Sequence, residues 1–191
     1  PDGSGHDGSA YYGLATGSGT AHRGFIKAVD APEEDYTTDD KLSISLFIKI
    51  DGKSAIATYL VSKTLEFSFI GNPNNSPTAF DSALCGDIYA AGDSTNCAYL
   101  GGTDMAAYTA SAVWEHWAFV YNTTTYEIYK NGVLQYTQGS ITGGIGNSAG
   151  KLAVGALNTW GFNGGVDEVS IFDEALEASD VMALSTCVVP D

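Results

Sequence analysis

Hydrophobic and polar residues alternate along several stretches of this chain, with the period of two that is typical of β-strands. In KLSISLFIKI (41–50), every second residue from Leu42 to Ile50 is aliphatic, and most residues between them are polar. This alternation predicts a strand with one buried face and one face toward solvent. A second run, EHWAFVYN (115–122), is apolar on both faces and predicts a strand inside a two-layer sandwich. Shorter runs predict further strands at 54–62, 64–71 and 151–157.

The strongest local signal is a β-hairpin in TYEIYKNGVLQYTQ (125–138). Two β-rich runs flank Asn131-Gly132, a pair that readily adopts the two positive φ angles of a type I′ turn. Only the end of the chain has a helical pattern, in which we expect Ser179 to cap a short helix. The apolar residues expected to face inward from that helix are Val181, Met182 and Leu184.

The fold class follows from many predicted strands, 23 glycines and no regular alternation of strands with helices. These features predict an all-β protein, a two-sheet antiparallel β-sandwich or jelly roll with a short C-terminal helix. A length of 191 residues fits a single domain, 1–191, with a core of substantial size.

The segment 71–103 is long, rich in turn-forming residues, and contains two of the three cysteines. Cys85 and Cys97 flank GDIYAAGDSTN, and we expect them to form a local disulfide in an extracellular protein. Cys187 can pair across the ends of the fold, pair outside this sequence or stay unpaired. The Cys-X-X-Cys and Cys–His spacings of zinc and redox sites do not occur in the sequence.

The chain is strongly acidic, with 23 Asp and Glu against 8 Lys and Arg and a formal net charge of −15. This charge disfavours nucleic acid, heparin-like chains and anionic membrane surfaces as partners. The acidity is explained either by a solvated surface suited to a salty medium or by carboxylates that converge on calcium, and both explanations can hold. Because neither a signal peptide nor a transmembrane segment is evident, we expect a module of a longer protein without membrane insertion.

The order of motifs from Trp114 onward is characteristic. It comprises WEHWAFVY, the Asn-Gly hairpin, LAVG (152–155), FNGGVDEV (162–169) and a short final helix over LEASDVMAL (176–184). This order resembles the laminin-G-like domains of the concanavalin A-like lectin/glucanase superfamily. The last 80 residues match strongly and the early strands more loosely, whereas 71–103 does not match and is interpreted as an insertion. The resemblance implies a jelly roll of two antiparallel sheets and an extracellular role in binding, most often of glycans and often alongside calcium.

Asp167 is the main candidate for a metal ligand. It shares its strand parity with Val169 and Ile171, so regular alternation would turn its carboxylate toward the core. A carboxylate there needs either a cation or several backbone N–H donors as partners. In many members of the superfamily the corresponding aspartate holds calcium on the flank of the sandwich. The calcium ligands that the resemblance implies are Asp167, carbonyls near Gly24, Asp2 and Asp30.

Candidate sugar-binding residues are aromatic and polar side chains in turn-rich segments. Aromatic rings stack on the C–H faces of sugars, while carboxylates and amides bond to the hydroxyl groups. The acidic residues of 71–103 are either turn formers or ligands of a second calcium that bridges to a sugar. The residues expected to bind ligand are Trp160, Tyr99, Tyr108, Asp93 and Asn96.

The aromatic stripe Trp117, Phe119 and Tyr121 is interpreted as core, although such stripes can also line a binding trough. His116, in the Trp-X-His motif, is interpreted as a structural hydrogen-bonding residue.

Catalysis is disfavoured by the absence of suitable pairs of residues. Retaining glycosidases need two carboxylates about 5 Å apart, but Asp167 and Glu168 are adjacent and would point to opposite faces of a strand. The motifs of jelly-roll lyases are missing as well. We therefore expect a secreted, non-catalytic glycan-binding module, stabilised by Ca²⁺ and part of a larger secreted enzyme or adhesin. The alternatives are a protein-binding or structural adhesion domain and, less favoured, a polysaccharide hydrolase or lyase.

Overall fold

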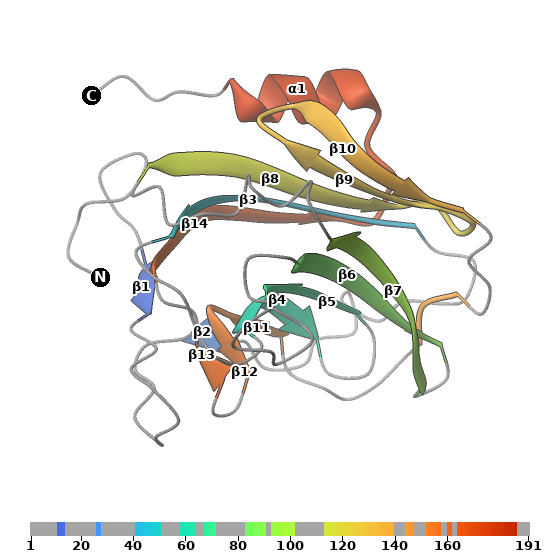
Figure 1. The fold of residues 1–191 in the computed structure, drawn as a ribbon, viewed down its shortest axis with the longest axis horizontal. Coiled ribbons are helices and arrows are strands. Elements are labelled where there is room, and N and C mark those ends of the chain that lie inside the picture. Colours follow the sequence, from blue (N-terminus) through green and yellow to red (C-terminus); the bar gives the residue numbers. More distant parts are fainter. Residues whose placement is uncertain are drawn as a thin grey trace.

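The computed structural model describes residues 11–13, 26–27, 41–50, 58–63, 67–71, 83–90, 93–101, 113–139, 144–146, 152–157, 160–161 and 164–186. These residues form strands and one C-terminal helix (Figure 1). The strands are β1 (Tyr11–Gly13), β2 (Ile26–Lys27), β3 (Leu42–Ile50), β4 (Thr58–Lys63), β5 (Phe67–Gly71), β6 (Ala83–Ala90), β7 (Asp93–Gly101), β8 (Trp114–Tyr121), β9 (Tyr126–Lys130), β10 (Val133–Gln138), β11 (Leu152–Val154), β12 (Ala156–Leu157), β13 (Trp160–Gly161) and β14 (Gly164–Phe172), and the helix is α1 (Ala178–Ser185).

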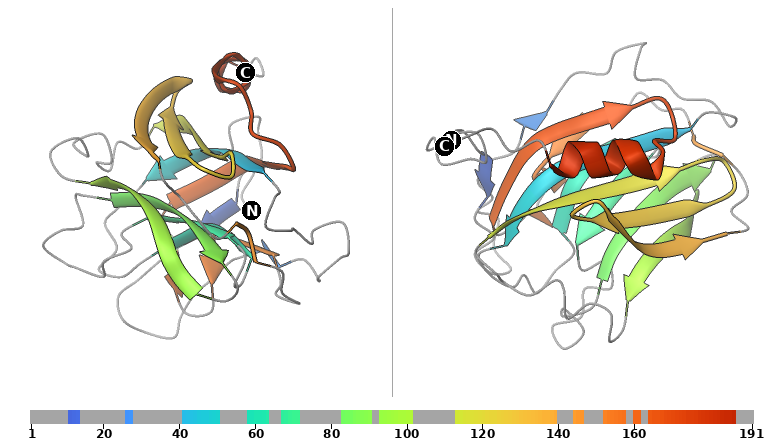
Figure 2. Two further views of the ribbon diagram at one scale, coloured as in Figure 1. Left: turned by 90° about the vertical axis from the view of Figure 1, so that its right-hand side faces the viewer. Right: turned by 90° about the horizontal axis from the view of Figure 1, so that it is seen from above.

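Two antiparallel sheets of six strands face each other. The first sheet has the order β1-β14-β3-β8-β9-β10, and the second has the order β2-β11-β4-β5-β6-β7. Strands β12 and β13 form a separate short ladder beside β4. Helix α1 lies on the outer side of the first sheet, away from the second sheet (Figures 1 and 2). This arrangement confirms the predicted all-β sandwich with a short C-terminal helix.

The core lies between the sheets and contains the aliphatic residues of β3 and the aromatic stripe of β8. The register pairs Leu46 with Trp117 and Ile44 with Phe119, and all four side chains are fully buried. Phe119 stacks on Phe69 of the second sheet, with ring centroids 6.1 Å apart. The stripe on β8 is therefore core, as predicted.

Strand β3 is buried on its other face too, which corrects the expectation that its polar face contacts solvent. The segment before helix α1 lies against that face at Ser43, which is fully buried. The Ser43 hydroxyl donates to the carbonyl of Glu174 (2.7 Å) and accepts from the N–H of Leu176 (3.0 Å). These bonds satisfy the buried hydroxyl and attach the segment before α1 to the sheet.

The hairpin turn between β9 and β10 has the predicted conformation, with positive φ angles of 48° at Asn131 and 76° at Gly132. The start of α1 differs from the prediction because its N-cap is Glu177, whose N–H donates to the Asp180 carboxylate (3.2 Å).

The inward face of α1 also differs in part from the prediction. Val181 is fully buried and Leu184 is half-buried, whereas Met182 is exposed. Successive helical residues are about 100° apart, so Val181 and Leu184 can share one face while Met182 turns away from it.

The segment expected to be turn-rich, 71–103, contains the hairpin of β6 and β7, which extends the second sheet. Its register places Cys85 opposite Tyr99 and Cys97 opposite Asp87. The two cysteines are therefore diagonal neighbours on paired strands, and their disulfide stays a prediction, as does the status of 71–103 as an insertion. Cys187 lies outside the described residues. Among the residues that the structure describes, no helix is long and apolar enough to cross a membrane.

Candidate functional site

Asp167 does not follow the strand parity that the sequence predicts. The register places it opposite Phe47, whereas Val166 lies opposite the core residue Ile48. A β-bulge follows Asp167, with Glu168 at a positive φ of 48°, and it returns Val169 to the core side. Because the bulge adds a residue to this strand, regular alternation fails there. The inward orientation predicted for Asp167 is therefore wrong.

The Asp167 carboxylate accepts a hydrogen bond from the N–H of Glu168, at 2.9 Å. One backbone donor of the kind expected for this carboxylate is thus present, and the bond spans the bulge. The other predicted calcium ligands, Asp2, Gly24 and Asp30, lie outside the described residues. Within the described part of the chain, no three His, Cys, Asp or Glu residues are close enough to hold a metal. The calcium site therefore stays a prediction.

Three of the predicted ligand-binding residues, Asp93, Asn96 and Tyr99, lie on β7 at the edge of the second sheet. Strand β7 contacts β9 and β10 at the corresponding edge of the first sheet, as Figures 1 and 2 show. Trp160 lies on β13, opposite Leu157 and beside β4. Since β5 and β6 separate β4 from β7, roughly 14 Å of sheet lies between the two places. The structure therefore does not bring Trp160 to β7, and Tyr108 lies outside the described residues.

The edge of the first sheet that β7 contacts, formed by β9 and β10, carries a set of polar and aromatic side chains on its inner side. Tyr136 and Gln138 lie opposite the core residues Ile128 and Tyr126, yet both are half-buried because β10 is the last strand of its sheet. The Tyr136 hydroxyl is 3.4 Å from the Gln138 side-chain oxygen. Glu115 and Lys130 also belong to the inner side of this sheet. We call Glu115, Lys130, Tyr136 and Gln138 the hairpin face.

An ion pair lies at the end of the hairpin face nearest the turn, because Lys130 is opposite Val133 whereas Tyr136 and Gln138 are opposite Ile128 and Tyr126. Lys130 Nζ is 2.8 Å from Glu115 Oε1, and each side chain is 16% exposed. The ammonium also lies 5.3 Å from the centre of the Trp117 ring, within range of a cation–π interaction. The Trp117 indole nitrogen is buried and has no hydrogen-bond partner.

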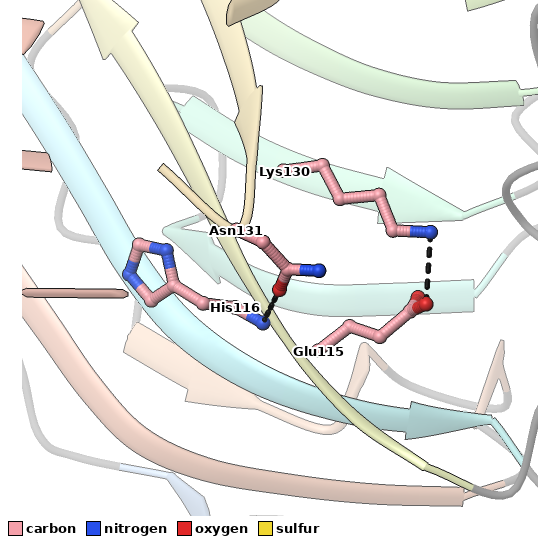
Figure 3. Close-up of polar contacts among 4 residues, drawn as sticks. All are labelled: Glu115, His116, Lys130 and Asn131. Atoms are coloured by element: carbon pink, nitrogen blue, oxygen red, sulfur yellow. Dashed lines mark hydrogen bonds and ion pairs between the residues drawn. The ribbon is translucent and has the colours of Figure 1, made fainter. Parts of the chain in front are cut away.

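The hairpin turn fixes the position of this ion pair. Asn131 Oδ1 accepts from the N–H of His116 (2.9 Å), and the Asn131 N–H donates to the His116 carbonyl (2.8 Å). Figure 3 shows the ring of His116 on the side of β8 opposite to Glu115 and Lys130. On that outer side, His116 Nε2 is 2.8 Å from the Ser45 hydroxyl, and its ring packs edge-on against Phe47. His116 is therefore structural, as predicted.

The tyrosines near this edge are poor acid–base groups at neutral pH. Burial raises the pKa of Tyr121 above its usual value of 10.0. The pKa of Tyr129 is raised further, first by burial and then by the hydrogen bond to Glu127 and the negative charges of Glu127 and Glu177. Both hydroxyls therefore stay protonated well above physiological pH.

A family model for the concanavalin A-like lectin/glucanase superfamily matches residues 26–182, which is most of the chain. The chain belongs to this superfamily. Its fold is similar to the binding domain of Paraclostridial Mosquitocidal Protein 1, with a TM-score of 0.69 and 16% identity over 95% of this chain and 44% of the other. No curated protein sequence matches it significantly.

Two botulinum neurotoxin structures are as similar to this superfamily domain as the mosquitocidal protein is, by TM-score and sequence identity. One comes from work on type C, whose cell entry depends on interaction with two ganglioside molecules. The other is the binding domain of neurotoxin DC in complex with rat synaptotagmin II. Each has a TM-score of 0.69 and 16% identity, over 94% of this chain and 42% of the other. The chain thus spans less than half of these solved chains, and the likeness establishes the shared fold.

The sequence pattern of this superfamily domain did not identify Tyr136 and Gln138. The register shifts between Leu134 and Tyr136, so counting alternate residues from Val133 assigns Gln135 to the inner side in place of Tyr136. The available signal was the polar composition of QYTQ, which is typical of an edge strand rather than a central strand.

Proposed function

We propose that this domain is a secreted, non-catalytic module that binds glycans at the hairpin face, as one part of a larger protein. The observation that carries the proposal is the half-open inner side of β9 and β10. On this side an ion pair, a tyrosine ring and an amide follow one another along the hairpin, from its turn toward the end of β10, and β7 lies beside β9 and β10 (Figures 1 and 2). Aromatic rings that stack on sugars and polar groups that bond to hydroxyls are the usual elements of such sites.

The similar toxin domains support a binding role. The mosquitocidal protein and neurotoxin DC structures are binding domains by description, and cell entry of the type C neurotoxin depends on interaction with gangliosides, which are glycolipids. A shared fold does not by itself carry a function, so the proposal depends on the chemistry of the hairpin face. The β7 residues Asp93, Asn96 and Tyr99 are proposed to complete the site because β7 contacts β9 and β10.

The chemistry of the hairpin face favours binding over hydrolysis. Its one carboxylate, Glu115, is held by Lys130, whereas a retaining glycosidase needs a second carboxylate about 5 Å away. Glu127 is the nearest acidic residue along β9, but it lies opposite Val120 and bonds to Tyr129 on the outer side of the sheet. Glu115 and Glu127 therefore do not form a catalytic pair on this sheet.

Replacing Tyr136 with alanine is expected to weaken glycan binding about five- to thirtyfold, since loss of one sugar-stacking ring costs about 1–2 kcal/mol. Leu134→Ala is the matched control because Leu134 lies on the same strand but opposite the outer-facing Tyr129. Binding would be identified on a glycan array and quantified by isothermal titration calorimetry. A large loss in Trp160→Ala with unchanged affinity in Tyr136→Ala would contradict this position and place the site at β13.

Calcium is proposed to stabilise the domain through Asp167, with Asp2, Asp30 and carbonyls near Gly24. A ligand at 100 times its Kd stabilises a folded protein by about 2.7 kcal/mol, and for this chain length that raises the Tm by roughly 5–10 °C. We expect excess calcium to produce such a shift and EGTA to reverse it, as measured by differential scanning calorimetry. Asp167→Asn should abolish the shift, and Asp173→Asn, an exposed acid after β14, is the control. Equal Tm values with calcium and with EGTA would contradict the proposal.

A protein-binding adhesion domain is the second candidate, and the exposed apolar residues near the hairpin turn favour it. Val133 and Leu134 are exposed at the start of β10. Met182 is exposed as well and lies against Gly132 of the turn. Adhesion to a protein partner without sugar affinity would support this candidate. The appearance of new reducing ends or unsaturated products from polysaccharides would instead indicate a hydrolase or a lyase.

A further inference from the structure

We propose that the hairpin face selects uncharged glycans and that Glu115 is the residue that sets this selectivity. The inference rests on the proposed glycan-binding function. It concerns the charge of the ligand, which the shared fold does not decide.

Lys130 is the described cation on the hairpin face, and Glu115 already neutralises it. The 2.8 Å separation between Nζ and Oε1 makes this a direct, charge-assisted contact. The ammonium also lies over the Trp117 ring, which holds it toward the sheet. A carboxylate or sulfate on a sugar would therefore have to compete with Glu115 for Lys130 and would meet a like charge next to it.

The other described lysine side chains lie elsewhere in the fold. Lys41 is exposed immediately before β3. Lys49 lies opposite Trp114, at a position of β3 that faces the outer side of the first sheet. Lys63 is fully buried on β4. None of these three belongs to the hairpin face, and the net charge of −15 repels anions at longer range.

Neutral sugars match the groups that this site offers. A sugar hydroxyl both donates and accepts hydrogen bonds, so it can donate to Glu115 and accept from Lys130 without separating the ion pair. The Gln138 amide provides a further donor and acceptor, and the half-buried ring of Tyr136 can stack on a C–H face. The ion pair then acts as a fixed pair of polar groups for hydroxyls, and it does not act as an anion-binding site.

The test is an array that pairs neutral oligosaccharides with their sialylated, sulfated and uronate-containing counterparts, probed with the intact domain in one buffer. We expect the unmodified domain to bind the neutral member of each pair at least tenfold more tightly. Glu115→Gln should raise the ratio of anionic to neutral affinity at least tenfold, because it releases Lys130 to pair with the sugar anion. Glu127→Gln is the matched control, since it makes the same change in net charge on the outer side of β9 and should leave the ratio unchanged.

The double substitution Glu115→Gln with Lys130→Gln removes both charges and should not raise the ratio. It keeps the test decisive if loss of the Glu115 carboxylate destabilises the single variant. Tighter binding of the anionic members by the unmodified domain would overturn the charge selectivity while supporting glycan binding. An equal rise of the ratio in Glu127→Gln would show that net charge, and not Glu115, sets the preference. Binding to no glycan of either class would overturn the proposed function itself.

Discussion

Replacing Trp117 with alanine is expected to lower the free energy of unfolding by about 3–5 kcal/mol, because truncating a buried tryptophan leaves a large cavity in a close-packed core. Trp117 is fully buried and lies opposite Leu46 in the centre of the sandwich. The change also removes the ring beneath the Lys130 ammonium. We therefore expect the variant to be much less stable and, where it folds, to hold the ion pair less firmly.

Trp117→Phe separates packing from hydrogen bonding at this position. The indole nitrogen has no hydrogen-bond partner, so phenylalanine removes a buried unsatisfied donor while it keeps an aromatic ring. We expect this variant to lose about 1–2 kcal/mol, clearly less than the loss in Trp117→Ala. Urea denaturation followed by intrinsic and near-UV signals would measure both values. A loss below about 1 kcal/mol in Trp117→Ala would contradict the central position assigned to this ring.

Replacing Gly132 with alanine is expected to cost about 2–3 kcal/mol, the sum of two effects. The first is the positive φ of 76°, which a residue with a Cβ rarely adopts. The second is steric, because a Cβ at this position would lie 2.7 Å from both Met182 Sδ and Ser185 Oγ and 3.0 Å from Met182 Cα. Either the turn or α1 must move, and the turn positions Lys130. We therefore expect weaker glycan binding together with the lower stability.

Gly139→Ala is the control for this substitution. A Cβ on Gly139 would meet only Thr125 Cγ2, at an ordinary contact distance of 3.9 Å, and Gly139 is not among the described glycines with positive φ. We expect its stability to stay within about 0.5 kcal/mol of the unmodified domain. Thermal unfolding of both variants, followed by circular dichroism, would measure the difference. Equal Tm values for the two glycine variants would show that the hairpin turn tolerates a side chain and that α1 does not restrict it.

The secondary structure around the core was predictable because it depends on local patterns. The alternation in 41–50 predicted β3, and the Asn131-Gly132 pair predicted the turn conformation that the structure has. Both signals act within a few residues, through side-chain period and allowed φ angles. The motif order after Trp114 likewise predicted the superfamily that the family model identifies.

Two of the predictions that failed depended on contacts between segments far apart in the sequence or on a single inserted residue. The polar face of β3 is buried because Glu174 and Leu176, about 130 residues later, bond to Ser43. Asp167 lies on the outer side of the sheet, and not on the predicted inner side, because the bulge at Glu168 interrupts the alternation. A pattern with a strict period of two contains no information about either event.

In the candidate site too, local features were predictable from the sequence, whereas the arrangement of strands was not. The sequence by itself determined β3, β8, the hairpin of β9 and β10 with its type I′ turn, the aromatic stripe and the acidic charge, because each follows from local conformation or from composition. Only the tertiary structure decided that β7 lies against β9 and β10, that Tyr136 and Gln138 face the inner side, and that Glu115 neutralises Lys130. The physical reason is that sheet order and register are set by burial of the whole core, which joins residues from distant strands into one surface.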